Sequence, residues 1–218
     1  MTTTAARPPR RYLTVHPWLV RLTHWINAFA IVCMVMSGWG IYNASPIFAF
    51  SFPPLVTLGG WLGGSIAVHF AAMWLLLGNG LVYVLYGLAS GHFRRHFLPL
   101  KPAQIGHDFV LALRFKLPHA AAGAYNAVQR LMYTGVVLLG LLVVVSGIAV
   151  WKPVQFDWLA ALMGGFDTAR IVHFSAMAGI VAFVVVHVLL VLIVPKTLLP
   201  MFTGRVRQSA LPQERVHD

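Results

Sequence analysis

The sequence predicts an all-α integral membrane protein, built as a bundle of four transmembrane helices with both termini in the cytoplasm. The chain has 218 residues, of which 59% are hydrophobic and only 10% are charged, and its mean hydropathy is +0.77. These values are typical of the integral membrane class. Its apolar residues gather in four runs that are each long enough to cross a hydrocarbon core as a helix.

The four runs are the predicted spans, at about residues 20–42, 61–88, 126–151 and 169–195. We expect one membrane domain, residues 1–218, because a four-helix bundle forms a single packing unit. The first run is too long for a signal peptide and lacks a clear cleavage site, so we expect it to remain as a span. Residues 1–15 are polar and contain proline, which predicts a loosely ordered segment.

The net charge of +11 comes from basic residues that lie mainly in the segments flanking the apolar runs. Basic residues gather before the first run, between the second and third runs, and after the fourth, whereas residues 42–60 contain no Lys or Arg. The positive-inside rule then places both termini and the loop 89–125 in the cytoplasm. We therefore expect contact with membrane lipid and no nucleic-acid partner.

The fourth run carries His173 and His187, which lie fourteen residues apart. In an α-helix fourteen positions return to nearly the same face and span roughly 21 Å. An ionisable side chain inside a membrane indicates a functional site, and each nitrogen of a neutral imidazole needs a partner there. Haem iron would satisfy this need. The alternative, two core histidines bonded to carbonyl groups, stays open at this point.

Two further intramembrane histidines, His24 and His69, lie at matching depths. The helix directions place His69 with His173 in the outer leaflet and His24 with His187 in the inner leaflet. Two facing pairs at two levels predict two haems, and ligation by two histidines favours electron transfer over oxygen binding. Because Cys33 is the single cysteine and no Cys-x-x-Cys-His motif is present, we expect both to be non-covalent haem b.

Two residues near the outer leaflet have two interpretations each. Gly38 shares a helix face with His24, and a glycine there would either leave room for a flat macrocycle or only allow close helix packing. Gly147 lies fourteen residues beyond Tyr133, in the same leaflet and on a similar face. Arg170 lies one turn before His173, where a haem propionate needs a cation. Its alternative is an exposed arginine at the start of a helix.

The cytoplasmic start of the third span is polar. Helical spacing places four side chains on one broad face, and these are Asn126, Gln129, Arg130 and Tyr133. They are candidates for contacts with a quinone or with the inner haem, although Arg130 alone is also explained as a snorkelling topology marker. Upstream of this face, residues 103–117 predict an interfacial helix.

These residues resemble the bacterial cytochrome b561 family of di-haem cytochromes b, which includes the gamma subunits of hydrogenase and formate dehydrogenase. The resemblance covers about residues 16–196, and its motifs are His24-Trp25, His69 and the pair His173-x13-His187. It implies that His69 and His173 hold an outer haem and that His24 and His187 hold an inner one. It also implies exchange of electrons with quinone, often near the inner haem, where Asn126 would be a contact. The stretches LGGWLGG and NGLVYVLYGLASGHFRR are similar to the branch found beside periplasmic molybdenum oxidoreductases.

We therefore predict an electron-transfer subunit that connects the quinone pool with a periplasmic redox protein of the molybdenum oxidoreductase or hydrogenase type. A homodimer is left open. A rival hypothesis is a stand-alone enzyme that oxidises superoxide and reduces quinone; it needs a basic outer pocket, for which only Lys152 and Arg170 are available. A third hypothesis, a haem-free channel or transporter, has no evident inverted repeat to support it.

Overall fold

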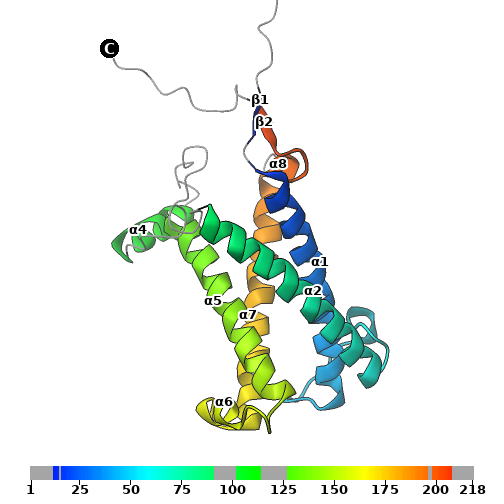
Figure 1. Ribbon diagram of the computed structural model, residues 1–218. Coiled ribbons are helices and arrows are strands. Elements are labelled where there is room, and N and C mark those ends of the chain that lie inside the picture. Colours follow the sequence, from blue (N-terminus) through cyan, green and yellow to red (C-terminus); the bar gives the residue numbers. More distant parts are fainter. Residues whose placement is uncertain (1–11, 15, 91–101, 114–126, 196–197, 208–218) are drawn as a thin grey trace, which may run out of the picture.

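The four predicted spans are confirmed by four long helices. The computed structural model describes residues 12–14, 16–90, 102–113, 127–195 and 198–207. The spanning helices are α1 (Trp18–Ala44), α2 (Leu62–Ala89), α5 (Ala127–Trp151) and α7 (Phe166–Ile193) (Figure 1). Each is long and apolar enough to cross a membrane. Their ends lie within three residues of the predicted ones, as in the fourth span, Phe166–Ile193 against 169–195.

The helices are arranged as two antiparallel hairpins. The backbones pack most closely between α1 and α2, the first hairpin, and between α5 and α7, the second hairpin. Small side chains allow these approaches, as is usual between membrane helices. The buried small residues of the four spans are Thr23, Ala30, Ser37, Ser65, Ala72, Gly87, Ser146, Ala149, Ala169 and Ala176. Large apolar side chains such as Trp74, Leu85 and Leu192 point outward instead, as expected for surfaces in contact with lipid.

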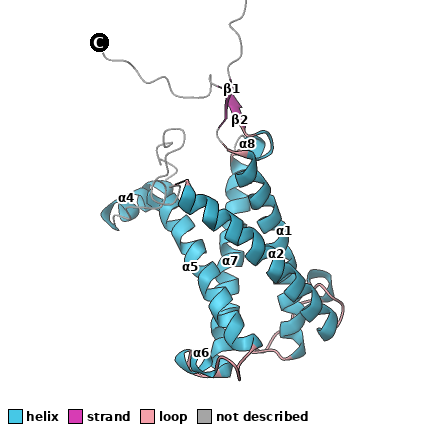
Figure 2. Cartoon of the chain, viewed as in Figure 1, coloured by secondary structure: helices cyan, strands magenta, loops and turns pink. Residues whose placement is uncertain are grey.

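The two ends of the bundle differ in structure (Figure 2). The end called here the terminal end carries β1 (Tyr12–Thr14), α4 (Pro102–Leu113), α8 (Leu198–Thr203) and β2 (Arg205–Arg207). The opposite end, called the loop end, carries the 3-10 turn η1 (Pro54–Val56) and α6 (Asp157–Leu162). Helix α4 confirms the helix predicted in this region over residues 102–113, whereas residues 114–117 lie outside the described residues. The assignment of the terminal end to the cytoplasm stays a prediction.

The chain ends meet at the terminal end. Strand β1 pairs with β2 in antiparallel register, with Tyr12 opposite Arg207 and Thr14 opposite Arg205. The expectation of a loosely ordered N-terminal segment is therefore wrong for residues 12–14. A three-residue strand has too short a pattern to be recognised, and its partner lies at the far end of the chain.

Side chains from the start of α1 anchor this pairing. Arg21 donates through Nη1 to the carbonyl of Phe202, and the Trp25 ring stacks on the Phe202 ring at 4.7 Å between centroids. The amide of His16 donates to the carbonyl of Gly204 at 3.4 Å. Burial, and to a smaller extent the Arg21 guanidinium, lower the pKa of His16 below its ordinary value. His16 is therefore neutral at pH 7 and adds no second cation beside Arg21.

The loop that follows α1 is organised by its own side chains. The Asn43 amide makes two 2.8 Å hydrogen bonds with the backbone of Phe52, donating through Nδ2 to its carbonyl and accepting from its amide. The Tyr42 hydroxyl bonds to the backbone of Phe48, and the Tyr42 ring packs against Phe174 at 5.1 Å between centroids. This loop therefore lies against the beginning of α7 and links the two hairpins.

Gly40→Ala should destabilise the first hairpin. A Cβ on Gly40 would lie 2.3 Å from Ser65 Oγ and 3.0 Å from Ser65 Cβ, so α1 and α2 would have to separate. Overpacking of this kind costs about 1–3 kcal/mol. Gly78→Ala is the control, because a Cβ there meets no atom within 4 Å and alanine favours a helix. Size-exclusion chromatography after heating in detergent measures the temperature at which half of the protein is lost from the folded peak. This temperature should be lower for Gly40→Ala alone, and equal temperatures in the two variants would contradict the packing.

Candidate functional site

The structure brings the four intramembrane histidines together as two pairs. Near the terminal end, the rings of His24 on α1 and His187 on α7 lie 6.2 Å apart between centroids, with their planes at 60°. Near the loop end, His69 on α2 and His173 on α7 lie close enough to interact electrostatically. Each pair joins one histidine of the first hairpin to one of the second. Helix α7 supplies a member of both pairs because its two histidines are fourteen residues apart on one face.

His69 is bonded to the helix that precedes it. Its Nδ1 lies 3.1 Å from the carbonyl oxygen of Met34 and 3.1 Å from the hydroxyl oxygen of Ser37, both on α1. His173 is bonded in the same way. Its Nδ1 lies 3.0 Å from the carbonyl oxygen of Val143 and 3.2 Å from the hydroxyl of Ser146, both on α5.

These bonds determine the tautomer of both rings. A backbone carbonyl can only accept a hydrogen bond, so Nδ1 of each ring must carry the proton. The lone pair of Nε2 is then free to bind a metal, which is the usual state of a histidine ligand whose other nitrogen donates to a carbonyl. The two alternatives from the sequence, core histidines bonded to carbonyls and haem ligands, are therefore compatible. The carbonyls satisfy one nitrogen of each ring and leave the other available for iron.

The two glycines noted in the sequence lie against these imidazoles. A Cβ on Gly38 would lie 3.5 Å from Cε1 of His69, and a Cβ on Gly147 would lie 3.1 Å from Cε1 of His173. Each glycine directly follows the serine that bonds to the same ring. The Ser-Gly pair of one helix therefore provides both a hydrogen-bond acceptor and the space in which the histidine of the next helix is seated.

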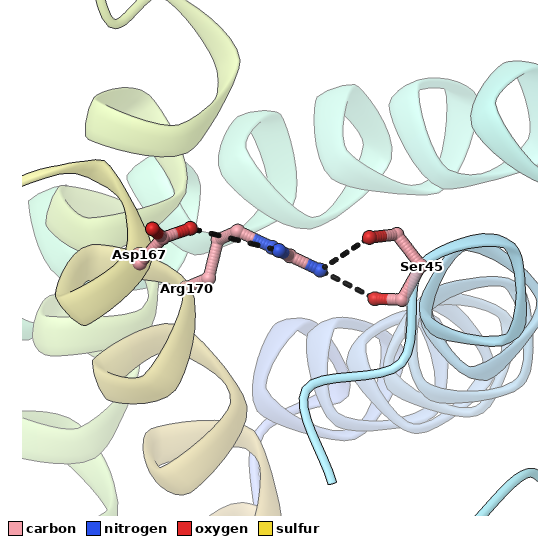
Figure 3. Close-up of polar contacts among 3 residues, drawn as sticks. All are labelled: Ser45, Asp167 and Arg170. Carbon is pink, nitrogen blue, oxygen red and sulfur yellow. Dashed lines mark hydrogen bonds and ion pairs between the residues drawn. The ribbon is translucent and has the colours of Figure 1, made fainter.

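Arg170 links the two hairpins at the loop end (Figure 3). Its Nη2 donates to the carbonyl of Ser45, just after α1, and lies 3.2 Å from the Ser45 hydroxyl, while its Nη1 lies 3.8 Å from the Asp167 carboxylate. The other candidate cation of this end, Lys152, lies over the Trp151 ring at 5.1 Å from its centroid. Both cations thus have partners, and a propionate contact for Arg170 stays a prediction.

The polar face predicted at the start of α5 is only partly described. Asn126 lies outside the described residues, and Gln129 is described as part of α5 without its side chain. Arg130 and Tyr133 are half-buried, and each interacts with other residues. The described part of this face, Arg130 and Tyr133, belongs to the start of α5, which lies at the terminal end of the bundle.

Two polar features were missed by the sequence analysis. Ser37 and Ser146 were not singled out, although the repeated Ser-Gly dipeptide was a usable signal. The second feature is an amide pair inside the first hairpin: Asn79 donates through Nδ2 to Asn27 Oδ1 at 2.7 Å and to the carbonyl of Thr23 at 2.8 Å. Two asparagines within apolar spans were the signal here, because a buried amide requires partners.

Comparison with known proteins gives one consistent result. The family model for prokaryotic cytochrome b561 matches residues 15–204. A putative protein-methionine-sulfoxide reductase subunit, YedZ1, from Azospira oryzae is 48% identical over 190 residues, which cover 87% of this chain and 96% of that protein. A probable Ni/Fe-hydrogenase B-type cytochrome subunit from Bradyrhizobium diazoefficiens is 25% identical over 191 residues, which cover 78% of this chain and 73% of that protein. A subunit of the same name from Cupriavidus necator is 25% identical over 190 residues, which cover 78% of this chain and 74% of that protein.

Gly147→Ala should disturb the loop-end histidine pair more than Gly38→Ala does. The added Cβ would lie 3.1 Å from the His173 ring but 3.5 Å from the His69 ring, and only the second distance is an ordinary contact. Rotation of a ligating imidazole changes the electron paramagnetic resonance spectrum of a low-spin ferric haem. We expect a shift of a haem signal in Gly147→Ala and a smaller shift in Gly38→Ala. The reverse ranking would contradict this seating of the rings.

Proposed function

Because the chain belongs to the prokaryotic cytochrome b561 family, we propose that this membrane electron-transfer subunit carries two haem b groups and connects quinone with a redox protein on the opposite side of the membrane. The observation that supports two haems is the arrangement of His24, His69, His173 and His187 as two pairs at two depths. Family membership also sets aside the haem-free transporter, since a b-type cytochrome carries haem b.

His69 and His173 would hold the outer haem, and His24 and His187 the inner one. Haem iron, when bound, takes up and releases one electron at a time. The residues of this chain would supply the ligands, and the Nδ1 bonds fix the orientation of His69 and His173. Two histidines on each iron leave no open coordination position, so the site favours electron transfer over oxygen chemistry. Arg170, three residues before His173, would be the cation for a propionate of the outer haem, a contact that requires it to exchange one of its present partners, Ser45 or Asp167.

We place the loop end on the periplasmic side of a bacterial inner membrane, following the distribution of basic residues. The partner is proposed to be a periplasmic reductase similar to the one named for the Azospira relative, with a hydrogenase as the second choice. Exposed apolar side chains at this end support a protein partner, because aromatic residues are enriched at such contacts. They include Phe48, Phe50, Leu55, Trp61 and Trp158.

The quinone site is proposed at the terminal end, near the inner haem. A quinone needs hydrogen-bond partners for its two carbonyl groups and an apolar path from the lipid. The sequence at the start of the third predicted span offers Asn126, Gln129, Arg130 and Tyr133 at helical spacing. The superoxide-oxidising alternative would need free cations at the loop end. Since Arg170 binds Ser45 and Asp167 while Lys152 lies over Trp151, no observation favours that alternative.

Substitution of the four histidines should affect the two haems selectively. Pyridine haemochrome analysis should give two b-type haems per chain. His69→Ala or His173→Ala should remove the outer haem or make it five-coordinate and leave the inner one, and His24→Ala or His187→Ala should do the reverse. Redox titration with optical detection distinguishes the two. One haem per chain, a covalent c-type haem, or the same haem affected in His69→Ala and His24→Ala would refute the pairing.

Asn126→Leu should slow the reduction of haem by quinol and leave both haem spectra unchanged, because it removes a hydrogen-bond partner and no ligand. Stopped-flow absorbance with a water-soluble quinol measures this rate. Lys152→Gln is the comparison at the opposite end and should leave the quinol rate unchanged, because Lys152 has no role in the proposed sites and lies over the Trp151 ring. Slower reduction in Lys152→Gln, together with a normal rate in Asn126→Leu, would move the quinone site to the loop end and favour the superoxide reaction.

A further inference from the structure

The two histidine pairs differ in their hydrogen-bond partners. At the loop end, both rings donate from Nδ1 to a carbonyl and a serine hydroxyl of the neighbouring helix. At the terminal end, the contacts of the rings are aromatic: His24 packs edge-on against Trp25 at 5.3 Å, and His187 stacks on Phe183 at 6.0 Å between centroids. Within the described residues, no carbonyl or hydroxyl accepts a hydrogen bond from the terminal-end pair.

The serine hydroxyls are oriented to accept from the imidazoles. Ser37 Oγ lies 2.6 Å from the carbonyl oxygen of Cys33, and Ser146 Oγ lies 2.6 Å from that of Leu142. Each hydroxyl therefore donates its hydrogen bond to the carbonyl four residues earlier in its own helix. Its lone pairs then face the Nδ1–H of the histidine. Both serines are fully buried, so water does not compete for these bonds.

We infer that Ser37 and Ser146 are positioning residues that lower the reduction potential of the outer haem below that of the inner haem. This inference rests on the proposed function, in which His69 and His173 are the outer ligands. A hydrogen bond from Nδ1–H makes an imidazole a more basic ligand. A more basic ligand stabilises ferric iron relative to ferrous iron and so lowers the potential. Each outer ligand has two acceptors, and the inner ligands have aromatic neighbours in their place.

This ordering has a consequence for electron transfer through the chain. With this order of potentials, an electron that enters at the terminal end would be retained at the haem held by His24 and His187 until the partner protein withdraws it through the haem held by His69 and His173. The side chains responsible lie on α1 and α5, while the ligands that they hold lie on α2 and α7. The difference in potential is thus built into the contacts within each hairpin.

Redox titration of the purified haem-loaded protein tests the inference, using Ser37→Ala, Ser146→Ala and the double variant. In His24→Ala the outer haem remains, so the reduction potential measured for that haem identifies the outer potential in the unmodified protein. We expect a higher outer potential in each serine variant, a larger rise in the double variant, and an unchanged inner potential. Ser37→Thr and Ser146→Thr keep the hydroxyl and should restore the original value. Ser65→Ala is the matched control, because Ser65 is as buried but bonds to the carbonyl of Leu58 and to no histidine.

The outcomes separate this inference from the proposed function. If two haems respond to the histidine substitutions as expected but the serine variants leave the outer potential unchanged, the inference is wrong and the di-haem function stands. An outer potential above the inner one in the unmodified protein would also overturn the inference. If the protein binds fewer than two haems, or if His24→Ala and His69→Ala affect the same haem, the proposed function itself fails.

Discussion

The rest of the structure depends on the hydrogen bonds between Nδ1 of two buried histidines and the carbonyls of the preceding helix. An imidazole inside a membrane needs a partner for each nitrogen, and lipid supplies none. The carbonyls of Met34 and Val143 satisfy one nitrogen of His69 and His173, and they fix which nitrogen remains free. The helices can approach this closely because Ser-Gly pairs stand opposite the rings. Packing and ligand orientation therefore have the same cause.

Most of the fold could be predicted from the sequence because lipid imposes simple conditions on it. A span must be long and apolar, so hydropathy gives the four helices to within three residues. The depths of the histidines follow from helix rise and direction. The hydrogen bonds of the rings to Ser37 and Ser146 were not predicted, since a serine in a span is usually explained by a bond to its own helix. Ser37 and Ser146 make that bond too, and only the structure shows the histidine on their other side. The β1–β2 pairing was missed because its strands are three residues long and lie at opposite ends of the chain.

The two hairpins are similar in detail at the loop end. In each, a Ser-Gly pair on the first helix bonds to a histidine on the second, and a phenylalanine follows that histidine. The matching residues are Ser37 and Ser146, Gly38 and Gly147, His69 and His173, Phe70 and Phe174, and Ala72 and Ala176. The same register pairs Arg21 with Arg130 near the terminal end. The hairpins differ at the terminal-end histidines: the position that matches His24 holds Tyr133, and the position that matches His187 holds Tyr83.

This difference between the hairpins determines which helices would hold the inner haem. With histidines in all matching positions, four side chains on four helices would compete for one iron. With tyrosines on α2 and α5, the histidine ligands of the inner haem would come from α1 and α7. Both haems would then join one hairpin to the other, because His69 and His24 belong to the first hairpin and His173 and His187 to the second. The closest backbone packing lies within the hairpins, and side chains such as Arg170 on Ser45 make the contacts between them. Iron–histidine bonds would thus add cohesion where the helices pack least closely, which couples cofactor binding to assembly of the bundle.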